Sequence, residues 1–392
     1  MLNGPFSPWP SFTQEEAEAV QRVLLSNRVN CWTGQEGREF EREFAAFAKT
    51  DHAIAVANGT VALDLALKGL GIGERDEVIV TSRTFLASVS SIVMAGAVPV
   101  FADVDRDSQN ITPETVAEKI TPRTRAIIAV HLAGWPCDVD GLMALGDRHG
   151  LYVIEDCAQA HGATYKGQSA GSIGHVGAWS FCQDKIMSTG GEGGMVTTND
   201  RELWKRMWAY KDHGKSWEAV YERDHPPGFR WLHESFGTNW RLTEMQSAIG
   251  RIQLARMPGW TTARRANAGQ IWEAARQCVG LRVPSIPDEI GHAAYKCYVF
   301  VEPDALKPGW DRDRIMQAIQ AEGVPCMSGS CSEVYLEKAF DGTGWRPDKP
   351  LPVAHELGET SLMFLCHPTL TDVEVEKTCR VLGEVMAQAA DC

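Results

Sequence analysis

Short apolar runs alternate with amphipathic stretches over the first half of the chain. Residues 53–56 form an apolar run of strand length, and residues 61–67 after it carry apolar side chains at helical spacing. A second run, at 151–155, ends in the carboxylate of Asp156. Strands that alternate with helices are typical of a parallel sheet with helices on both faces. The pattern therefore predicts an α/β domain from about residue 53 to residue 198.

The second half of the chain predicts a long helical region and then a smaller α/β unit. A polar, aromatic and proline-rich stretch at 221–235 breaks the periodicity. The predicted elements beyond residue 200 are helices at 200–221, 243–257, 311–322 and 372–389 and a strand at 298–301. At about 150 residues per folding unit, 392 residues make two to three units. We expect a large domain over 1–259 and a small C-terminal domain over 260–392.

Composition and charge narrow the classes of function. Hydrophobic residues make up 44% and charged residues 23%, as in ordinary soluble enzymes. The net charge is −13 and the cationic residues are scattered, so neither nucleic acid nor an anionic membrane is an expected partner. No apolar run approaches about 18 residues, and the first residues lack the basic and apolar parts of a secretory signal. The eleven cysteines include no Cys-x-x-Cys pair, so we expect reduced thiols, no metal site and a cytoplasmic location.

Lys185 is the first candidate catalytic residue. It follows the apolar residues around Phe181 and precedes a glycine-rich turn at 190–194. A lysine that bonds a carbonyl cofactor needs partial desolvation, and glycines let the backbone approach a ligand closely. A solvated surface lysine is the alternative for any single position.

Asp156 is the second candidate, because it ends the predicted strand at 151–155. The carboxyl ends of strands form the ligand crevice of an open α/β sheet, so an acid there can contact a bound ligand. Such an acid keeps the ring nitrogen of pyridoxal phosphate protonated, so that the ring acts as an electron sink. The alternative is that Asp156 caps a helix that begins near Ala158.

Gly59 and Thr60 predict an anion site. They lie where the strand at 53–56 turns into the helix that follows. A helix N-terminus offers free amides and a positive dipole to a phosphate, and the Thr60 hydroxyl adds a donor. Plain helix capping is the alternative for this pair.

With these residues in this order, the chain resembles the DegT/DnrJ/EryC1/StrS sugar aminotransferases among the fold-type I pyridoxal phosphate enzymes. The resemblance runs over nearly the whole chain. Its motifs are Trp32–Gly34 with Phe40 and Glu41, Asn58–Thr60, Val78–Val80 with Thr84 and Phe85, Gly96–Asp103, Val130–Gly134, Glu155–Gln159, Ser180 and Phe181 with Lys185, Gly191–Gly194 and Gly237–Gln246.

The resemblance implies a large domain with a mostly parallel seven-stranded sheet, a smaller C-terminal α/β domain and pyridoxal phosphate (PLP) as cofactor. Lys185 would bond the cofactor covalently and act as the base, and Asp156 would hold the ring nitrogen. Phe85 would stack on one face of the ring, and Gln159 would lie against the opposite face or near the phenolic oxygen. Gly59, Thr60 and Ser180 would hold the phosphate, and Asn239 would reach it from the neighbouring subunit of a homodimer with shared active sites.

The implied reaction is a ping-pong transfer of an amino group from L-glutamate to a keto or aldehydo sugar carried on a nucleotide, in surface-polysaccharide, lipopolysaccharide or secondary-metabolite biosynthesis. For the sugar, the resemblance points to Trp32 and Gly34 in a covering N-terminal segment, to His131 and to Arg241. An ion pair at a dimer interface is the alternative for Arg241, and a structural histidine the alternative for His131.

The sugar itself stays open. The stretch 327–333 departs from the histidine-containing loop expected in many members that use nucleotide sugars. A free sugar acid, such as an 8-oxo-3-deoxy-octulosonate, is therefore an alternative substrate. A PLP-dependent sugar dehydratase or a non-catalytic PLP-binding regulator would be alternatives of another class, but each would be expected to lose Lys185 or Asp156 or to add cluster-binding cysteines.

Overall fold

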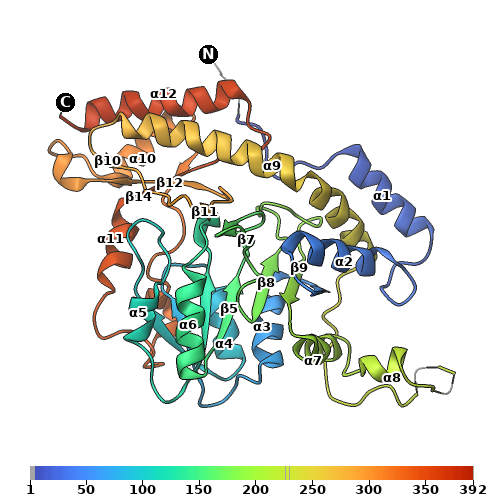
Figure 1. Ribbon diagram of the computed structural model, residues 1–392. Coiled ribbons are helices and arrows are strands. Elements are labelled where there is room, and N and C mark those ends of the chain that lie inside the picture. The colour runs from blue at the N-terminus through green and yellow to red at the C-terminus, as the bar shows by residue number, and fades with distance from the viewer. Residues whose placement is uncertain (1–4, 226, 229, 392) are drawn as a thin grey trace.

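The computed structural model describes residues 5–225, 227–228 and 230–391, and its centre is a seven-stranded sheet (Figure 1). The spatial order is β1-β9-β8-β5-β4-β2-β3. The strands are β1 His52–Val56, β2 Glu77–Thr81, β3 Val98–Ala102, β4 Thr124–Val130, β5 Tyr152–Asp156, β8 Val176–Ser180 and β9 Gly194–Thr198. Only β9 runs antiparallel to its neighbours in this sheet. The mostly parallel sheet that the sequence predicts is confirmed.

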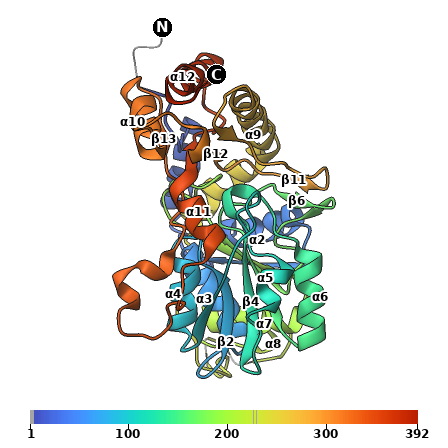
Figure 2. The same cartoon turned by 90° about the vertical axis from the view of Figure 1, so that its left-hand side faces the viewer.

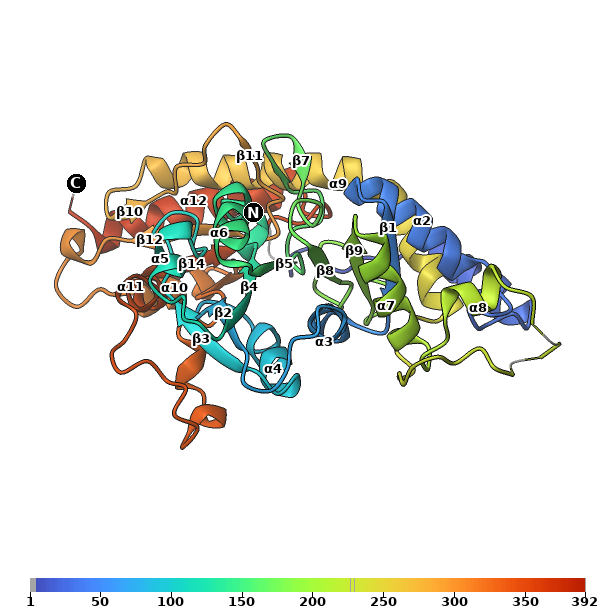
Figure 3. The same ribbon diagram turned by 60° about the horizontal axis from the view of Figure 1, so that its bottom comes forward.

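Helices cover both faces of this sheet. Figure 3 shows α3, α4 and α7 on one side of the strands and α2, α6 and α9 on the other. The helices are α1 Gln14–Leu25, α2 Glu36–Ala48, α3 Gly59–Gly69, α4 Ala87–Met94, α5 Pro113–Ala117, α6 Val139–His149, α7 Arg201–Lys211, α8 Trp217–Tyr221, α9 Glu244–Arg276, α10 Arg312–Ala321, α11 Pro352–Thr360 and α12 Asp372–Ala389. This arrangement follows from right-handed crossovers between parallel strands.

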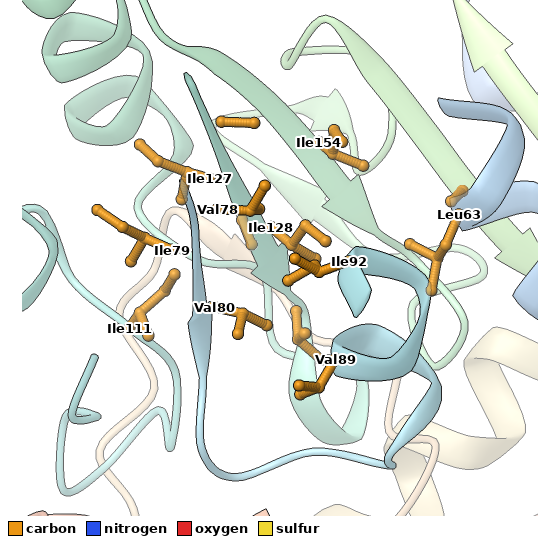
Figure 4. Close-up of a cluster of buried hydrophobic side chains, with 14 of the residues drawn as sticks. Leu63, Val78, Ile79, Val80, Val89, Ile92, Ile111, Ile127, Ile128 and Ile154 are labelled. Carbon is orange, nitrogen blue, oxygen red and sulfur yellow. The ribbon is translucent and has the colours of Figure 1, made fainter. Parts of the chain in front are cut away.

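The central strands are apolar on both faces because both faces are buried. Successive residues of a strand point to opposite sides of the sheet. In β2, Val78 and Val80 point towards Val89 of α4, whereas Ile79 lies on the other side, near Ile111 (Figure 4). All five of these aliphatic side chains are buried, with an exposure of at most 1%. Continuous apolar runs, and not alternating ones, are expected for such strands.

A second, smaller sheet lies beside α9, α10 and α12 (Figure 2). It is antiparallel, with the order β10-β12-β14-β13. Its strands are β10 Leu281–Arg282, β12 Cys297–Val301, β13 Cys326–Met327 and β14 Ser361–Phe364, and a three-stranded ribbon consists of β6 Thr164–Tyr165, β7 Gln168–Ser169 and β11 Ile290–Gly291. The predicted strand at 298–301 and the predicted helices at 311–322 and 372–389 are confirmed within one residue.

Two helices differ from the prediction. The helix expected at 200–221 is divided into α7 and α8, because residues 212–216 turn through His213 and Gly214, both at positive φ. The helix expected to end near residue 257 continues through Pro258 to Arg276. A proline removes one helical hydrogen bond, but Pro258 lies on the exposed side of α9, where water reaches the backbone. The division into domains at 259/260 stays a prediction, because α9 runs through that point.

Within the described residues, no helix combines the length and the apolar character that crossing a membrane requires.

Candidate active site

The candidate residues of the sequence gather at the carboxyl ends of the central strands. Asp156 is the last residue of β5 and Ser180 the last residue of β8. In the sheet, Asp156 lies between Val130 of β4 and Ala178 of β8. Lys185 follows in the turn after β8. Ligands of open α/β sheets bind at this edge, so the strands bring these side chains to one crevice.

The Asp156 carboxylate is nearly buried and held at both oxygens. Oδ2 accepts a hydrogen bond from Ser88 Oγ at 2.7 Å, and Oδ1 accepts one from the Ala158 amide at 3.1 Å. The segment after Asp156 is a turn and not a helix, so helix capping does not explain this residue. Ser88, which the sequence analysis missed, fixes the carboxylate and leaves each oxygen a lone pair for a further donor.

The start of α3 is shaped for a close ligand. The Asn58 side chain accepts the Val61 amide, whereas the amides of Gly59 and Thr60 have no acceptor within the helix. A Cβ placed on Gly59 would lie 2.5 Å from Cβ of Ser180. Only glycine lets β8 and the start of α3 come this close. The three residues therefore form an anion cradle of the kind that a cofactor phosphate needs.

Lys185 is half-buried, with one aromatic residue near its amine and another at its backbone carbonyl. Its Nζ lies 5.3 Å from the centre of the Tyr295 ring, and its carbonyl accepts the indole Nε1–H of Trp9 at 2.8 Å. The Tyr295 hydroxyl donates to Asp184 Oδ2 at 2.5 Å. Burial raises the pKa of Asp184, but Lys185, the Tyr295 hydroxyl and Lys296 outweigh it, so the net shift is downward. Trp9, Asp184 and Tyr295 were not identified from the sequence.

The two residues expected at the cofactor ring differ in how firmly they are held. The Phe85 side chain, two residues before α4, is 71% exposed, so its ring face is accessible to a ligand. Gln159 is nearly buried, and its Oε1 accepts the Ala133 amide at 2.7 Å. The loop after β13 touches this region, because the Thr84 amide donates to the Cys331 carbonyl at 3.1 Å. Both roles at the ring stay predictions.

His131 is placed differently from the expectation that it contacts the sugar. Its side chain is fully buried beneath the crevice, with Nε2 2.9 Å from Glu155 Oε2 and Nδ1 accepting the Cys137 amide. Glu155 also accepts the amides of Gly171, Ile173 and Gly174. Both ring nitrogens are therefore occupied, and His131 braces β4 against β5. Cys157 lies near this pair, but the carboxylate's acceptor positions are already used, which argues against a metal site.

Trp32, Gly34 and Arg241 do not form one surface. Trp32 and Arg241 line a small cavity of about 40 Å³, where Arg241 Nη1 lies 2.6 Å from Oδ1 of the buried Asp212. Gly34 lies instead against Glu244, whose carboxylate would meet a Cβ at that position. The ion pair of Arg241 is thus made within the chain. Sugar contacts by Trp32, Gly34 and Arg241 stay predictions.

The sheet is mostly parallel, and it brings a lysine, a carboxylate and an anion cradle to one edge. This arrangement defines the class of the fold-type I PLP enzymes. The family model of the DegT/DnrJ/EryC1/StrS aminotransferases matches residues 10–383, and the chain belongs to this family. The protein is therefore a PLP-dependent aminotransferase. The anion cradle fits the cofactor's phosphate, and the Asp156 carboxylate has the acceptor capacity that the ring nitrogen needs.

Three similar proteins illustrate the match. A solved aminotransferase from Psychrobacter cryohalolentis is 65% identical, has a TM-score of 0.96 and covers 98% of this chain and 99% of its own. The dTDP-3-amino-3,4,6-trideoxy-alpha-D-glucose transaminase of Streptomyces venezuelae is 37% identical over 91% of this chain and 88% of its own. The UDP-N-acetyl-3-dehydro-alpha-D-glucosamine 3-aminotransferase of Acidithiobacillus ferrooxidans is 36% identical over 90% and 89%.

Proposed function

We propose that this aminotransferase takes its amino group from L-glutamate and passes it to a keto sugar that is carried on a nucleoside diphosphate. The observation that carries the proposal is the convergence of Lys185, Asp156 and the Gly59–Ser180 cradle at one sheet edge. Two of the proteins described above, those of Streptomyces venezuelae and Acidithiobacillus ferrooxidans, are named for dTDP- and UDP-linked sugars, which supports a nucleotide sugar over a free sugar acid.

The chain's own residues divide the chemistry between them. Bound PLP supplies a carbonyl for amine exchange and an electron sink for the charge on the donor's α-carbon. Lys185 Nζ would take the proton from that carbon and deliver it to the former carbonyl carbon of the cofactor, and would move a proton in the opposite direction when the keto sugar is aminated. Asp156, fixed by Ser88, keeps a proton on the cofactor's ring nitrogen. Gly59, Thr60 and Ser180 would hold the phosphate and so fix the cofactor's position, and Phe85 would stack on its ring.

A homodimer with shared sites is part of the proposal. Asn239 is exposed, in a segment fixed to the end of α7 by hydrogen bonds between residues 210–214 and 235–240. The neighbouring Phe236 side chain is fully exposed and Trp231 is 82% exposed. Exposed aromatic residues next to a rigid segment favour a protein contact. In the dimer, Asn239 would donate to the phosphate in the partner's cradle.

The first experiment follows the absorbance of the purified holoenzyme. Glutamate should replace the band at roughly 410–430 nm by one near roughly 330 nm, as the cofactor takes up the amino group. A band that glutamate leaves unchanged would indicate that the amino donor is another compound. Lys185→Ala should remove the first band and all turnover, and full turnover by this variant would disprove the assignment of the lysine.

The sugar is tested with the aminated form of the enzyme. A panel of keto sugars linked to dTDP, UDP and GDP, with a free keto sugar acid beside them, should restore the original band only for a nucleotide-linked member. Restoration by the free acid alone would favour the alternative substrate.

Shared sites are tested by mixing two inactive variants. Asn239→Ala protein combined with Lys185→Ala protein should regain part of the activity, because one of the two sites in a mixed dimer then holds both native residues. Subunit exchange without any recovery would argue against a shared site.

A further inference from the structure

A second cavity lies next to Lys185, between the N-terminal segment, α9 and the end of β14. Its volume is about 290 Å³, and residues of six separate segments line it, among them Trp9, Arg264, Lys296 and His367. None of these residues belongs to the cofactor cradle. The volume is at the small end of ligand sites, suited to a molecule of a few carbon atoms and not to a nucleoside diphosphate.

Arg264 is the unusual residue of this cavity. It is 1% exposed, and its Nη1 makes one long hydrogen bond of 3.5 Å to the Tyr295 carbonyl. Nε and Nη2 have no hydrogen-bond partner among the described residues. The guanidinium lies 4.8 Å from the centre of the Trp9 ring. A buried charge with unmet donors is costly, so the position indicates a missing acceptor.

Further cationic side chains near Arg264 favour the binding of an anion. Lys296 and Lys185 lie within about 5 Å of the Tyr295 ring centre, at 4.9 and 5.3 Å. Burial lowers the pKa of Arg264 to about 10 and that of His367 to about 4, so the arginine stays charged at neutral pH and the histidine neutral. Asp184 is the carboxylate among the lining residues, and the Tyr295 hydroxyl already bonds it.

The cavity and the reacting lysine share two neighbouring residues, Tyr295 and Trp9. Tyr295 presents its ring to Lys185 and its carbonyl to Arg264. Trp9 donates to the Lys185 carbonyl and covers the Arg264 guanidinium. Trp9 in turn lies against Trp260 and His367, at ring distances of 5.1 and 5.9 Å. A ligand in the cavity therefore contacts the residues that position Lys185.

We propose that this cavity binds a carboxylate group of the amino donor, with Arg264 and Lys296 as the cationic partners and Trp9 as the group that moves aside to admit it. The inference rests on the proposed function for the identity of the donor. A carboxylate meets the planar pair of free guanidinium donors better than a single-point anion does. The donor's amine would then face Lys185 while its carboxylate is anchored beyond Tyr295.

Glutarate is the probe, because it carries both carboxylates of glutamate but no amine and cannot react. Calorimetric titration of the holoenzyme should show binding that Arg264→Met and Lys296→Met weaken at least tenfold. Arg265→Met is the matched control: it lies one position along the same helix, is exposed, and bonds the His292 and Gly162 carbonyls outside the cavity. It should bind glutarate within twofold of the native protein. Inorganic phosphate should compete poorly, and equal competition would overturn the preference for a carboxylate.

The two half-reactions separate this inference from the proposed function. In Arg264→Met the glutamate concentration needed for half-maximal conversion of the cofactor band should rise at least tenfold, whereas the single turnover of the aminated enzyme with the keto sugar should keep its rate. Unchanged glutarate binding by Arg264→Met, in an enzyme that glutamate still converts, would overturn the inference and leave the function standing. A native enzyme that binds glutarate but is not converted by glutamate would instead contradict the donor. If Arg264→Met does not fold, Lys296→Met decides by the same criteria.

Discussion

Arg83, in the loop after β2, and Arg264, in α9, are both buried, but their hydrogen-bonding needs are met differently. Arg83 donates to Gln109 Oε1 from two nitrogens, at 2.8 and 3.0 Å, and to the hydroxyls of Ser332 and Ser361 at 2.8 Å. Arg264 makes one long bond and leaves two nitrogens without an acceptor in the described part of the chain. The two arginines are equally buried but have different roles. Arg83 joins the β2–α4 loop to the small sheet, and Arg264 has free donors for a ligand.

Replacing Arg83 should have the largest effect on stability. In Arg83→Met, the Gln109 oxygen and two serine hydroxyls lose their donor in a dry environment, which should lower the free energy of unfolding by about 3 kcal/mol or more. The midpoint of urea unfolding, followed by circular dichroism, measures this loss. Arg83→Lys should restore part of it, and a midpoint equal to that of the native protein would remove the contrast with Arg264.

Replacing Arg264 should leave the ligand-free protein as stable as before or raise the free energy of unfolding by about 1 kcal/mol, because a buried charge without an acceptor is exchanged for an apolar side chain. The same urea experiment tests it, with glutarate as the second variable. Glutarate should stabilise the native protein and not Arg264→Met. A loss of stability as large as that of Arg83→Met would make Arg264 a structural residue.

The charge of Arg264 should also appear in the pH dependence of stability. Burial, and then Arg264 and Lys296, lower the pKa of His367 to about 4, against about 6.5 for an unfolded histidine. The folded state thus resists protonation, so this contribution is fully present above pH 6.5 and is lost as the pH falls towards 4. In Arg264→Met the pKa of His367 should rise, and the loss of stability between pH 6.5 and 4 should become smaller. Arg265→Met should show the native slope, and an equal change in both variants would argue against a local effect.

The smallest effect is expected for Arg265→Met itself. The side chain is exposed but bonds the His292 and Gly162 carbonyls, so its removal should lower the free energy of unfolding by no more than about 1 kcal/mol. A larger loss would show that α9 depends on both arginines, and the comparison between positions 264 and 83 would then need a different control.

Features that depend on neighbouring residues in the chain were predictable from the sequence. Asp156 ends its strand because an apolar run stops there, and α12 begins where Thr371 caps it. The continuation of α9 was not predictable, because the missing hydrogen bond at Pro258 is a local cost that packing along 33 residues outweighs. The resemblance pointed to His131 for the sugar, with a structural histidine as the alternative, and its side chain turns inward to Glu155, which only the folded sheet shows.

The Arg264 cavity could not be predicted from the sequence, for a different reason. Trp9, Arg264, Lys296 and His367 come from four distant segments, and no local pattern joins them. One signal was present, however. Position 264 lies on the same face of α9 as the buried residues Ala268, Ile271, Trp272 and Ala275, and a charged residue in such a stripe is a candidate for function.

The hydrogen bond from Ser7 Oγ to Glu374 Oε2, 3.0 Å long, joins positions that are 367 residues apart in the chain. At about 5–20 residues per second of ribosomal synthesis, Ser7 waits roughly 20–70 seconds for α12 to be made. Until then Trp9 lacks the anchored segment that holds it over Arg264 and against Lys185. A nascent chain can thus complete its large sheet and its cofactor cradle well before the lysine's surroundings are closed. The enzyme should gain the ability to capture its cofactor earlier in its biogenesis than the ability to use it.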